Sequence, residues 1–164
     1  MKRVVLLAAD GARLLDEQAG LILSIVARRH RPICLAPAAD AATRDGLAAL
    51  GADVVEAPIE AAAEAWMFGR IAARRQLGLR LLALRPQAVL ALDHAALAAA
   101  GPGLRRLPGV RIVAALPHLP RQGEAIDRAF LRASPLLSAL ALPRDFELQR
   151  SEEHTSELQS QFRI

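Results

Sequence analysis

The sequence is poor in several residue types that carry recognisable chemistry. Its 164 residues include one cysteine, one tryptophan, no tyrosine and only 3% aromatic residues. A single cysteine excludes an internal disulfide and a cysteine zinc cluster. The scarcity of aromatic side chains removes the stacking platforms of single-stranded nucleic-acid binders, so no nucleic-acid partner is expected. No uninterrupted apolar run reaches the roughly 18 residues of a transmembrane helix.

The residues that are abundant indicate one compact domain, or most of one. Hydrophobic residues make up 53% of the chain and charged residues 23%, a balance that excludes intrinsic disorder. All but one of the 21 basic residues are arginine, and asparagine is absent. This bias towards GC-rich codons indicates a GC-rich genome, so arginine content alone does not indicate an anionic ligand. A net charge of +4 permits an anionic partner without requiring one.

Composition changes abruptly near Arg150. Serine and threonine are rare before it, whereas residues 151–160 are rich in both and contain no alanine. Residues 150–160 resemble the in-frame translation of a common sequencing-library adapter; the alternative is a natural polar tail. We interpret 150–164 as a non-native tail in which His154 and its neighbouring glutamates form no site. Residues 1–149 are then expected to be the first part of a longer protein.

Six short β-rich runs alternate with longer helical patterns along residues 1–149. The runs are 3–9, 32–36, 53–57, 88–92, 111–116 and 138–142. Several are apolar throughout, which is typical of parallel strands covered on both faces. The order predicts a doubly wound, Rossmann-like α/β domain with a mostly parallel six-stranded sheet and helices on both faces.

The segments between these runs show helix patterns and helix ends. Apolar residues recur at helical spacing in three sets: Leu15, Ala19, Ile22 and Val26; Trp66, Ala73, Leu77, Leu81 and Leu84; and Ile126, Phe130, Ala133 and Leu137. Asp40 is expected to cap a short helix that Gly51 ends, and Arg85-Pro86 to stop the long one. Residues 101–103 (Gly-Pro-Gly) and Pro108-Gly109 predict a loop.

The candidate site residues are those that follow strands, because ligands of such sheets bind beyond the carboxyl ends. They are Asp10 and Gly11, Asp93 and His94, and the segment from His118 to Arg121. No GxGxxG or GxxxxGK(S/T) motif follows the first run, which argues against a standard dinucleotide site or phosphate-binding loop. A receiver domain is disfavoured because the only lysine is Lys2.

Each candidate has a structural and a functional interpretation. Asp93 either caps the following helix or joins His94 in binding a sugar hydroxyl. His118, between prolines, is either a solvent-facing loop residue or an acid, base or donor. Asp10, Asp93 and His118 lack the spacing of a metal site, so no metal is expected, and Cys34 is expected in the core.

Arginines recur on the long helix, at Arg70, Arg74, Arg75 and Arg80. They form either a solvated face or a cationic surface that rests on anionic lipid headgroups.

Residues 1–149 also resemble the N-terminal domain of a GT-B glycosyltransferase, of the retaining family four (glycosyltransferase group 1) type. Three stretches carry the likeness: 32–55, with a helix ending in Leu-Gly between two strands; 84–90, with Arg-Pro before a strand; and 126–148, with a helix, a strand and the start of another helix.

The resemblance implies the acceptor-binding half of a two-domain enzyme. The acceptor would be a lipid-linked molecule or a glycan, bound by Asp10, Gly11, Asp93, His94 and Arg121. His118 matches the histidine that the family places near the reacting sugar, which makes it the catalytic candidate.

The donor side of such an enzyme would lie outside this chain. The nucleotide-sugar would bind a C-terminal domain that is missing beyond Gln149, so no cofactor is expected here and the fragment is expected to be inactive alone. The resemblance further implies a bacterial, cytoplasmic enzyme of cell-envelope or polysaccharide biosynthesis, peripheral on the inner face of the membrane.

Two alternatives remain open. Another GT-B enzyme, such as a nucleotide-sugar epimerase, shares the same N-domain architecture. A non-catalytic, flavodoxin-like binding module has the same fold class, because one fold hosts many functions.

Overall fold

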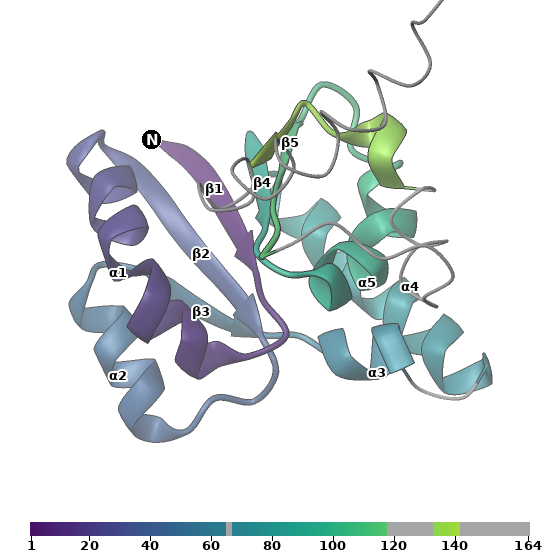
Figure 1. Cartoon of the computed structure of the whole chain (residues 1–164), viewed down its shortest axis with the longest axis horizontal. Helices are drawn as coiled ribbons and strands as arrows, with labels where there is room; N and C mark the ends of the chain where they lie inside the picture. Colours follow the sequence, from purple (N-terminus) through teal and green to yellow (C-terminus); the bar gives the residue numbers. More distant parts are fainter. Residues whose placement is uncertain (65–66, 118–132, 142–164) are drawn as a thin grey trace, which may run out of the picture.

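A six-stranded, all-parallel sheet forms the centre of the computed structural model, which describes residues 1–64, 67–117 and 133–141 (Figure 1). Its strand order is β3-β2-β1-β4-β5-β6. The strands are β1 (Lys2–Leu7), β2 (His30–Ala36), β3 (Asp53–Glu56), β4 (Ala88–Ala91), β5 (Arg111–Ala115) and β6 (Ala139–Ala141). The predicted doubly wound α/β fold and all six predicted strands are confirmed.

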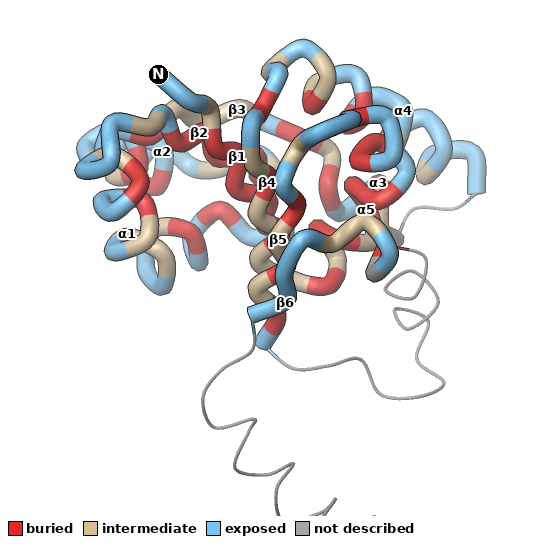
Figure 2. The backbone as a smooth tube through the Cα atoms, turned by 90° about the horizontal axis from the view of Figure 1, so that it is seen from above, coloured by how far each residue is buried: buried red, intermediate tan, exposed pale blue. Residues whose placement is uncertain are grey.

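Helices cover both faces of the sheet. They are α1 (Gly11–Ala27), α2 (Ala41–Ala49), α3 (Ile59–Glu64), α4 (Met67–Leu84) and α5 (His94–Leu104), with a short 3₁₀ helix at Ser134–Leu136. Val4 and Leu6 of β1 pack towards α1 and α2, whereas Val5 and Leu7 pack towards α3, α4 and α5. Alternate residues of β1 thus pack into two apolar clusters, one on each face of the sheet. Figure 2 shows the buried strands between the helices.

The predicted caps of α2 are present. The Asp40 carboxylate accepts a hydrogen bond from the Thr43 amide at 2.7 Å, which satisfies one of the free donors at the helix start. Gly51 follows the helix with a φ of +83°, a conformation that glycine adopts without a steric penalty. These short-range signals were therefore sufficient to place the helix.

The buried face of α1 differs from the predicted stripe. The side chains buried against the sheet are Leu14, Ile22 and Ile25, so of the predicted set only Ile22 belongs to this face. Leu15 instead lies against Gly46 of α2, and Val26 against Gly51. Leu15 and Val26 are thus displaced by one residue from the buried positions Leu14 and Ile25, and they contact α2 and the residue that ends it rather than the sheet.

The predicted loop at 101–103 is wrong, because these residues belong to α5. Gly103 crosses α4 so closely that a Cβ atom there would lie 2.8 Å from the Cα of Gly78. Pro102 gives up one backbone hydrogen bond inside the helix, but the packing of the two glycines keeps the helix intact. The predicted turn at Pro108-Gly109 is present, with Gly109 at a φ of +74°.

The long helix ends as predicted, at Leu84 before Arg85-Pro86. Trp66 and most of the predicted helix containing Ile126 and Phe130 lie outside the described residues.

The close crossing of α4 and α5 makes Gly103 sensitive to substitution. Gly103→Ala is expected to lower the free energy of unfolding by about 1–3 kcal/mol, because the added methyl meets backbone that cannot move aside. Urea denaturation measures this. The control is Gly20→Ala on α1, where nothing lies within 4 Å of the added Cβ and a gain of about 0.5–1 kcal/mol is expected. Equal effects of the two substitutions would contradict the packing described.

Candidate functional site

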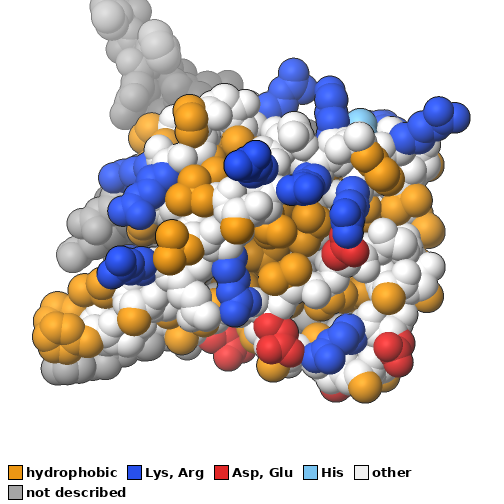
Figure 3. All heavy atoms as spheres, turned by 180° about the vertical axis from the view of Figure 1, so that it is seen from behind, with side chains coloured by type: hydrophobic (Ala, Val, Ile, Leu, Met, Phe, Trp, Pro, Cys, Tyr) orange, Lys and Arg blue, Asp and Glu red, His pale blue; other side chains and the backbone are white. Residues whose placement is uncertain are grey.

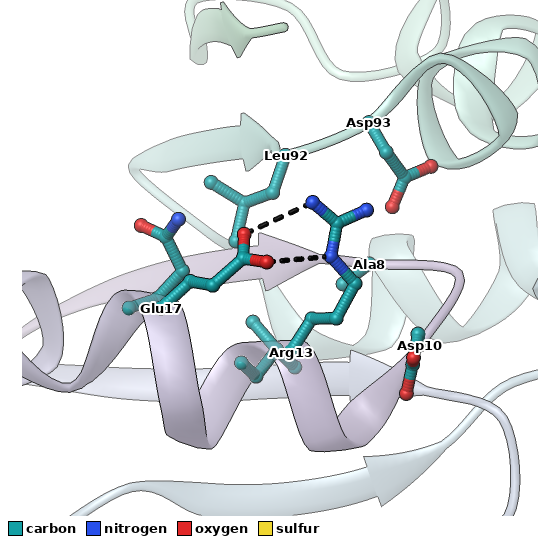
Figure 4. A pocket seen from close by; sticks show the side chains of 8 residues that line it. Ala8, Asp10, Arg13, Glu17, Leu92 and Asp93 are labelled. Carbon is teal, nitrogen blue, oxygen red and sulfur yellow. Dashed lines mark hydrogen bonds and ion pairs between the residues drawn. The ribbon is translucent and has the colours of Figure 1, made fainter. Parts of the chain in front are cut away.

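A small polar cleft lies at the carboxyl ends of β1 and β4, where the strand order reverses. From β1 the chain proceeds to β2 on one side, and the connection after β3 returns it to β4 on the other. Such switch points leave an opening between diverging loops and are the usual ligand sites of doubly wound sheets. The cleft is lined by Ala8, Asp10, Arg13, Leu14, Glu17, Gln18, Leu92 and Asp93 (Figure 4).

Asp93 joins the two loops that border the cleft. One carboxylate oxygen accepts a hydrogen bond from the Ala96 amide at 2.6 Å, which caps α5. The other accepts from the Ala9 amide at 2.7 Å, in the loop after β1. The capping interpretation of Asp93 is therefore confirmed. Because a carboxylate has about four lone-pair positions, Asp93 retains capacity to accept from a ligand.

Asp10 and Gly11 begin α1 at the edge of the cleft. The Asp10 carboxylate accepts a hydrogen bond from the Ala12 amide at 2.9 Å and caps the helix. Gly11 is buried, and a Cβ atom there would lie 3.3 Å from that of Ala39. Gly11 therefore lets the first turn of α1 lie close to the loop after β2.

Arg13 and Glu17 extend over the cleft from successive turns of α1. The guanidinium donates through Nε to Oε1 at 2.9 Å and through Nη2 to Oε2 at 3.0 Å, as Figure 4 shows. The hydrogen bond that Arg13 donates to Glu17, the charge of Glu17, and the charges of Asp93 and Asp10 raise the pKa of Arg13. The hydrogen bond from Arg13 is the main cause that lowers the pKa of Glu17. Both side chains are therefore ionised at neutral pH.

The size and charge of the cleft limit what it binds. Its cavity volume is about 20 Å³, room for little more than one water molecule, so a larger ligand lies across its rim or displaces the ion pair. The side chains of Arg13 and Glu17 are 53% and 52% exposed, and exposed ion pairs of this kind are weak and easily exchanged. Three carboxylates and one guanidinium line the cleft, a balance that favours hydroxyl donors over anions.

Of the remaining predicted site residues, the structure describes only His94, which lies outside the cleft. His94 is buried at the start of α5 and is absent from the cleft lining. His118 and Arg121 lie outside the described residues. Cys34 is fully buried, which confirms it as a core residue, and burial raises the pKa of its thiol to about 12, which is unsuited to a nucleophile. Within the described ranges, no three His, Cys, Asp or Glu side chains converge as metal ligands.

Sequence reasoning placed Asp10 and Asp93 at this edge but missed Arg13 and Glu17. Their spacing of four residues is the available signal, since it places opposite charges on one helix face. That spacing is common on solvated helices, so only the position of β4 beside α1 shows that the pair borders a cleft.

Asp93 is expected to be important for stability. Asp93→Ala removes the cap of α5 and leaves the Ala9 amide without its acceptor, so the free energy of unfolding should fall by about 1–3 kcal/mol. Asp93→Asn keeps one acceptor oxygen and should cost less. Asp16→Ala, an exposed change on α1, is the control and should stay within about 0.5 kcal/mol. A urea unfolding curve for Asp93→Ala that matches the control would show that the two hydrogen bonds contribute little.

The sequence matches no known family model and no curated protein sequence. Solved structures nevertheless share the fold. MurG of Acinetobacter baumannii superposes with a TM-score of 0.63 at 12% identity, over 88% of this chain and 42% of that one. The UDP-GlcNAc 2-epimerase of Methanocaldococcus jannaschii gives 0.57 at 11% identity, over 89% and 40%. CalG4, the calicheamicin glycosyltransferase, gives 0.53 at 14% identity, over 82% and 37%.

These superpositions are similarities of fold, because the identities are very low. The chain spans less than half the length of each of the three proteins. What it shares with them is a Rossmann-like sheet with helices on both faces. The chain therefore has a GT-B-like α/β fold.

Proposed function

We propose that this chain is the N-terminal, acceptor-side part of a GT-B glycosyltransferase of the family-four type. The complete enzyme would move a sugar from a nucleotide-sugar donor to a lipid-linked or polysaccharide acceptor. The observation that carries this proposal is the polar cleft at the switch point of a GT-B-like sheet. Glycosyltransferases among the structural neighbours support it, and so does the short span of the chain relative to them.

The cleft would bind the hydroxyl groups of the acceptor. Asp10 and Asp93 accept hydrogen bonds from sugar hydroxyls, while Arg13 donates to sugar oxygens once Glu17 releases it. Because carboxylates outnumber the guanidinium here, the bound part of the acceptor would be a neutral sugar. A phosphate of a lipid-linked acceptor would lie outside the cleft.

The other predicted site residues have separate roles in this proposal. Gly11 shapes the start of α1, and buried His94 supports the α5 end of the cleft. His118 would act near the reacting sugar and Arg121 would contact the acceptor. Residues 1–149 would form the native domain and 150–164 a non-native tail, with the enzyme continuing beyond Gln149. The complete protein would be bacterial and cytoplasmic, attached to the inner face of the membrane.

The epimerase among the neighbours supports a second candidate. Its TM-score of 0.57 lies between those of the two glycosyltransferases, so the fold does not separate the two activities. The tests below distinguish them, since an epimerase needs no acceptor sugar in this cleft.

Sugar binding tests the cleft directly. Methyl glycosides of glucose, galactose and N-acetylglucosamine serve as probes in saturation-transfer NMR and titration. We expect at least one to bind, and Arg13→Gln to weaken its binding about tenfold through loss of charge-assisted hydrogen bonds. The Arg13 side chain is half exposed, so thermal unfolding should change little.

The matched control is Asp53→Asn. It breaks the exposed Arg31–Asp53 ion pair at the amino ends of β2 and β3, the opposite edge of the sheet. Binding that falls equally in the control, or no binding of any probe, would contradict the acceptor assignment of the cleft.

Transferase activity is expected to be absent from the isolated chain. Sugar transfer needs charge stabilisation at the leaving nucleoside diphosphate, and in this proposal those groups belong to the part of the enzyme beyond Gln149. The purified protein, incubated with UDP-N-acetylglucosamine and the binding glycoside, should release no UDP above the buffer rate. UDP release that scales with protein concentration would show that this chain contains the donor site.

A further inference from the structure

A second hollow lies beyond the carboxyl end of β3, the strand at one edge of the sheet. This β3 hollow is lined by residues from the loop after β2, from the end of β3 and the turn that follows, and from α4: Ala38, Glu56, Ala57, Pro58, Gln76 and Arg80. Figure 2 shows β3 between α2 and α4. Figure 3, which shows the molecule from behind, displays hydrophobic side chains between basic and acidic ones across this side.

The size and place of the β3 hollow suit a small ligand. Its cavity volume is about 240 Å³, against about 20 Å³ for the cleft between β1 and β4. Pockets for drug-sized ligands begin at roughly 300 Å³, so the β3 hollow has room for a molecule of monosaccharide size. The carboxyl ends of parallel strands are also where ligands of such sheets bind.

The helix α4 contributes the only cation in the lining. Neither α4 nor any other helix in the described part of the chain is long and apolar enough to cross a membrane. Its arginines do not share one exposed face, since Arg75 is exposed whereas Arg70, Arg74 and Arg80 are half-buried. The interpretation of these arginines as a solvated face therefore fits Arg75 alone.

Arg80 brings a positive charge to the β3 hollow that the domain itself does not neutralise. The Nε of Arg74 donates to the Ala62 carbonyl of α3 at 2.8 Å. By contrast, no hydrogen bond or ion pair joins Arg80 to any residue that the structure describes. An arginine stem can lie along apolar surface while its guanidinium stays available, and a guanidinium binds a carboxylate through two parallel hydrogen bonds.

Glu56 brings a carboxylate whose charge is already compensated. It accepts a hydrogen bond from Nη2 of Arg44 on α2 at 2.9 Å, and the same Nη2 donates to the Ala39 carbonyl at 3.2 Å. Arg44 therefore holds the end of β3 and the loop after β2 together. The remaining lone pairs of the Glu56 carboxylate are available to hydroxyl donors. With Arg44, Glu56 and Arg80 counted together, the β3 hollow has an excess of one positive charge.

We propose that the β3 hollow binds a sugar acid, a monosaccharide with one carboxylate such as a hexuronate. The Arg80 guanidinium would bind the carboxylate, Glu56 would accept hydrogen bonds from ring hydroxyls, and the Gln76 amide would donate to and accept from them. A single negative charge on the ligand matches the excess positive charge of the hollow. The apolar surface of Ala57 and Pro58 would lie against the sugar ring.

The same groups disfavour other small ligands. A divalent cation would meet one carboxylate that is already paired with Arg44, and within the described ranges no three His, Cys, Asp or Glu side chains converge. The ammonium group of an amino acid would face that same compensated carboxylate. A sugar phosphate shares the chemistry of an anion on Arg80, but at neutral pH its second negative charge would have no partner.

The β3 hollow and the cleft are separate sites. They share no lining residue, and β2 lies between β1 and β3 in the sheet. The three carboxylates of the cleft repel an anion, whereas the β3 hollow attracts one. The inference therefore does not depend on the proposed transferase, because a sugar acid can bind here whatever the cleft binds.

Titration calorimetry of the full chain with D-glucuronate tests this inference. Binding should saturate, should weaken as salt is raised, and should be tighter than that of D-glucose or D-glucose 6-phosphate. Arg80→Gln should weaken glucuronate binding about tenfold through loss of the charge-assisted hydrogen bonds. Arg80→Lys should recover only part of the affinity, since an ammonium cannot form the bidentate pair.

The matched control is Arg75→Gln, which removes an exposed arginine of the same helix that does not line the hollow. It should leave glucuronate binding unchanged. Gln76→Ala changes an exposed lining residue and should weaken binding about threefold, which keeps the test decisive if Arg80→Gln lowers thermal stability. Arg80→Gln should leave the binding of methyl glycosides unchanged, so this test and that of the cleft can fail separately.

Three results would overturn the inference. The first is the absence of saturable glucuronate binding, and the second is a loss in Arg75→Gln equal to that in Arg80→Gln. The third is binding of D-glucose as tight as that of glucuronate, which would remove the role of Arg80. Tighter binding of glucose 6-phosphate, lost in Arg80→Gln, would replace the sugar acid by a sugar phosphate.

Discussion

One carboxylate holds together two loops that the strand order drives apart. At the switch between β1 and β4 the chain departs in opposite directions, which opens the sheet edge. Asp93 spans that opening by accepting from the amide of Ala9 in one loop and from the amide of Ala96 at the start of α5. The same group therefore begins a helix, fixes the end of β1 and forms one wall of the cleft. Asp10 and Arg13 lie beside this contact, because α1 starts at Gly11, two residues after Ala9, whose amide Asp93 binds.

A second constraint operates in the helix layer on the other face of the sheet, which contains α4 and α5. The helices α4 and α5 cross at Gly78 and Gly103, where side chains would keep them apart. This close packing turns the small and leucine side chains of α4 inwards and leaves Phe68, Ile71 and Leu79 on the outside. The apolar outer face is thus a consequence of which residues the crossing requires.

The sequence predicted features that depend on neighbouring residues. Apolar strands show themselves through composition, and Asp40 and Gly51 mark the ends of α2 through local hydrogen bonding and backbone conformation. The sequence did not predict features that depend on contacts between segments far apart in the chain. The Gly-Pro-Gly segment at 101–103 has turn chemistry, but contact with a helix some 25 residues earlier keeps it helical. Likewise Leu15 shares a helical stripe with Ile22, yet the position of α2 decides which of them faces the sheet.

In the cleft, too, some residues could be predicted from their neighbours in the sequence and others only from the packed structure. Asp10 and Asp93 were placed at the sheet edge because they follow strands. The ion pair of Arg13 and Glu17 became part of the site only when β4 was seen beside α1. The arginines of α4 were visible as charges, whereas only the packed helix shows that Arg70, Arg74 and Arg80 are half-buried and Arg75 is exposed.

In the proposed function, this α/β domain is the acceptor side of a larger, two-domain enzyme. Sequencing the source DNA through codon 149 tests this proposal. We expect the reading frame to continue for roughly another 150–200 residues, encoding a second α/β domain in place of residues 150–164. A natural stop codon directly after the codons for Ser151 to Ile164 would contradict it and would favour a self-contained binding module.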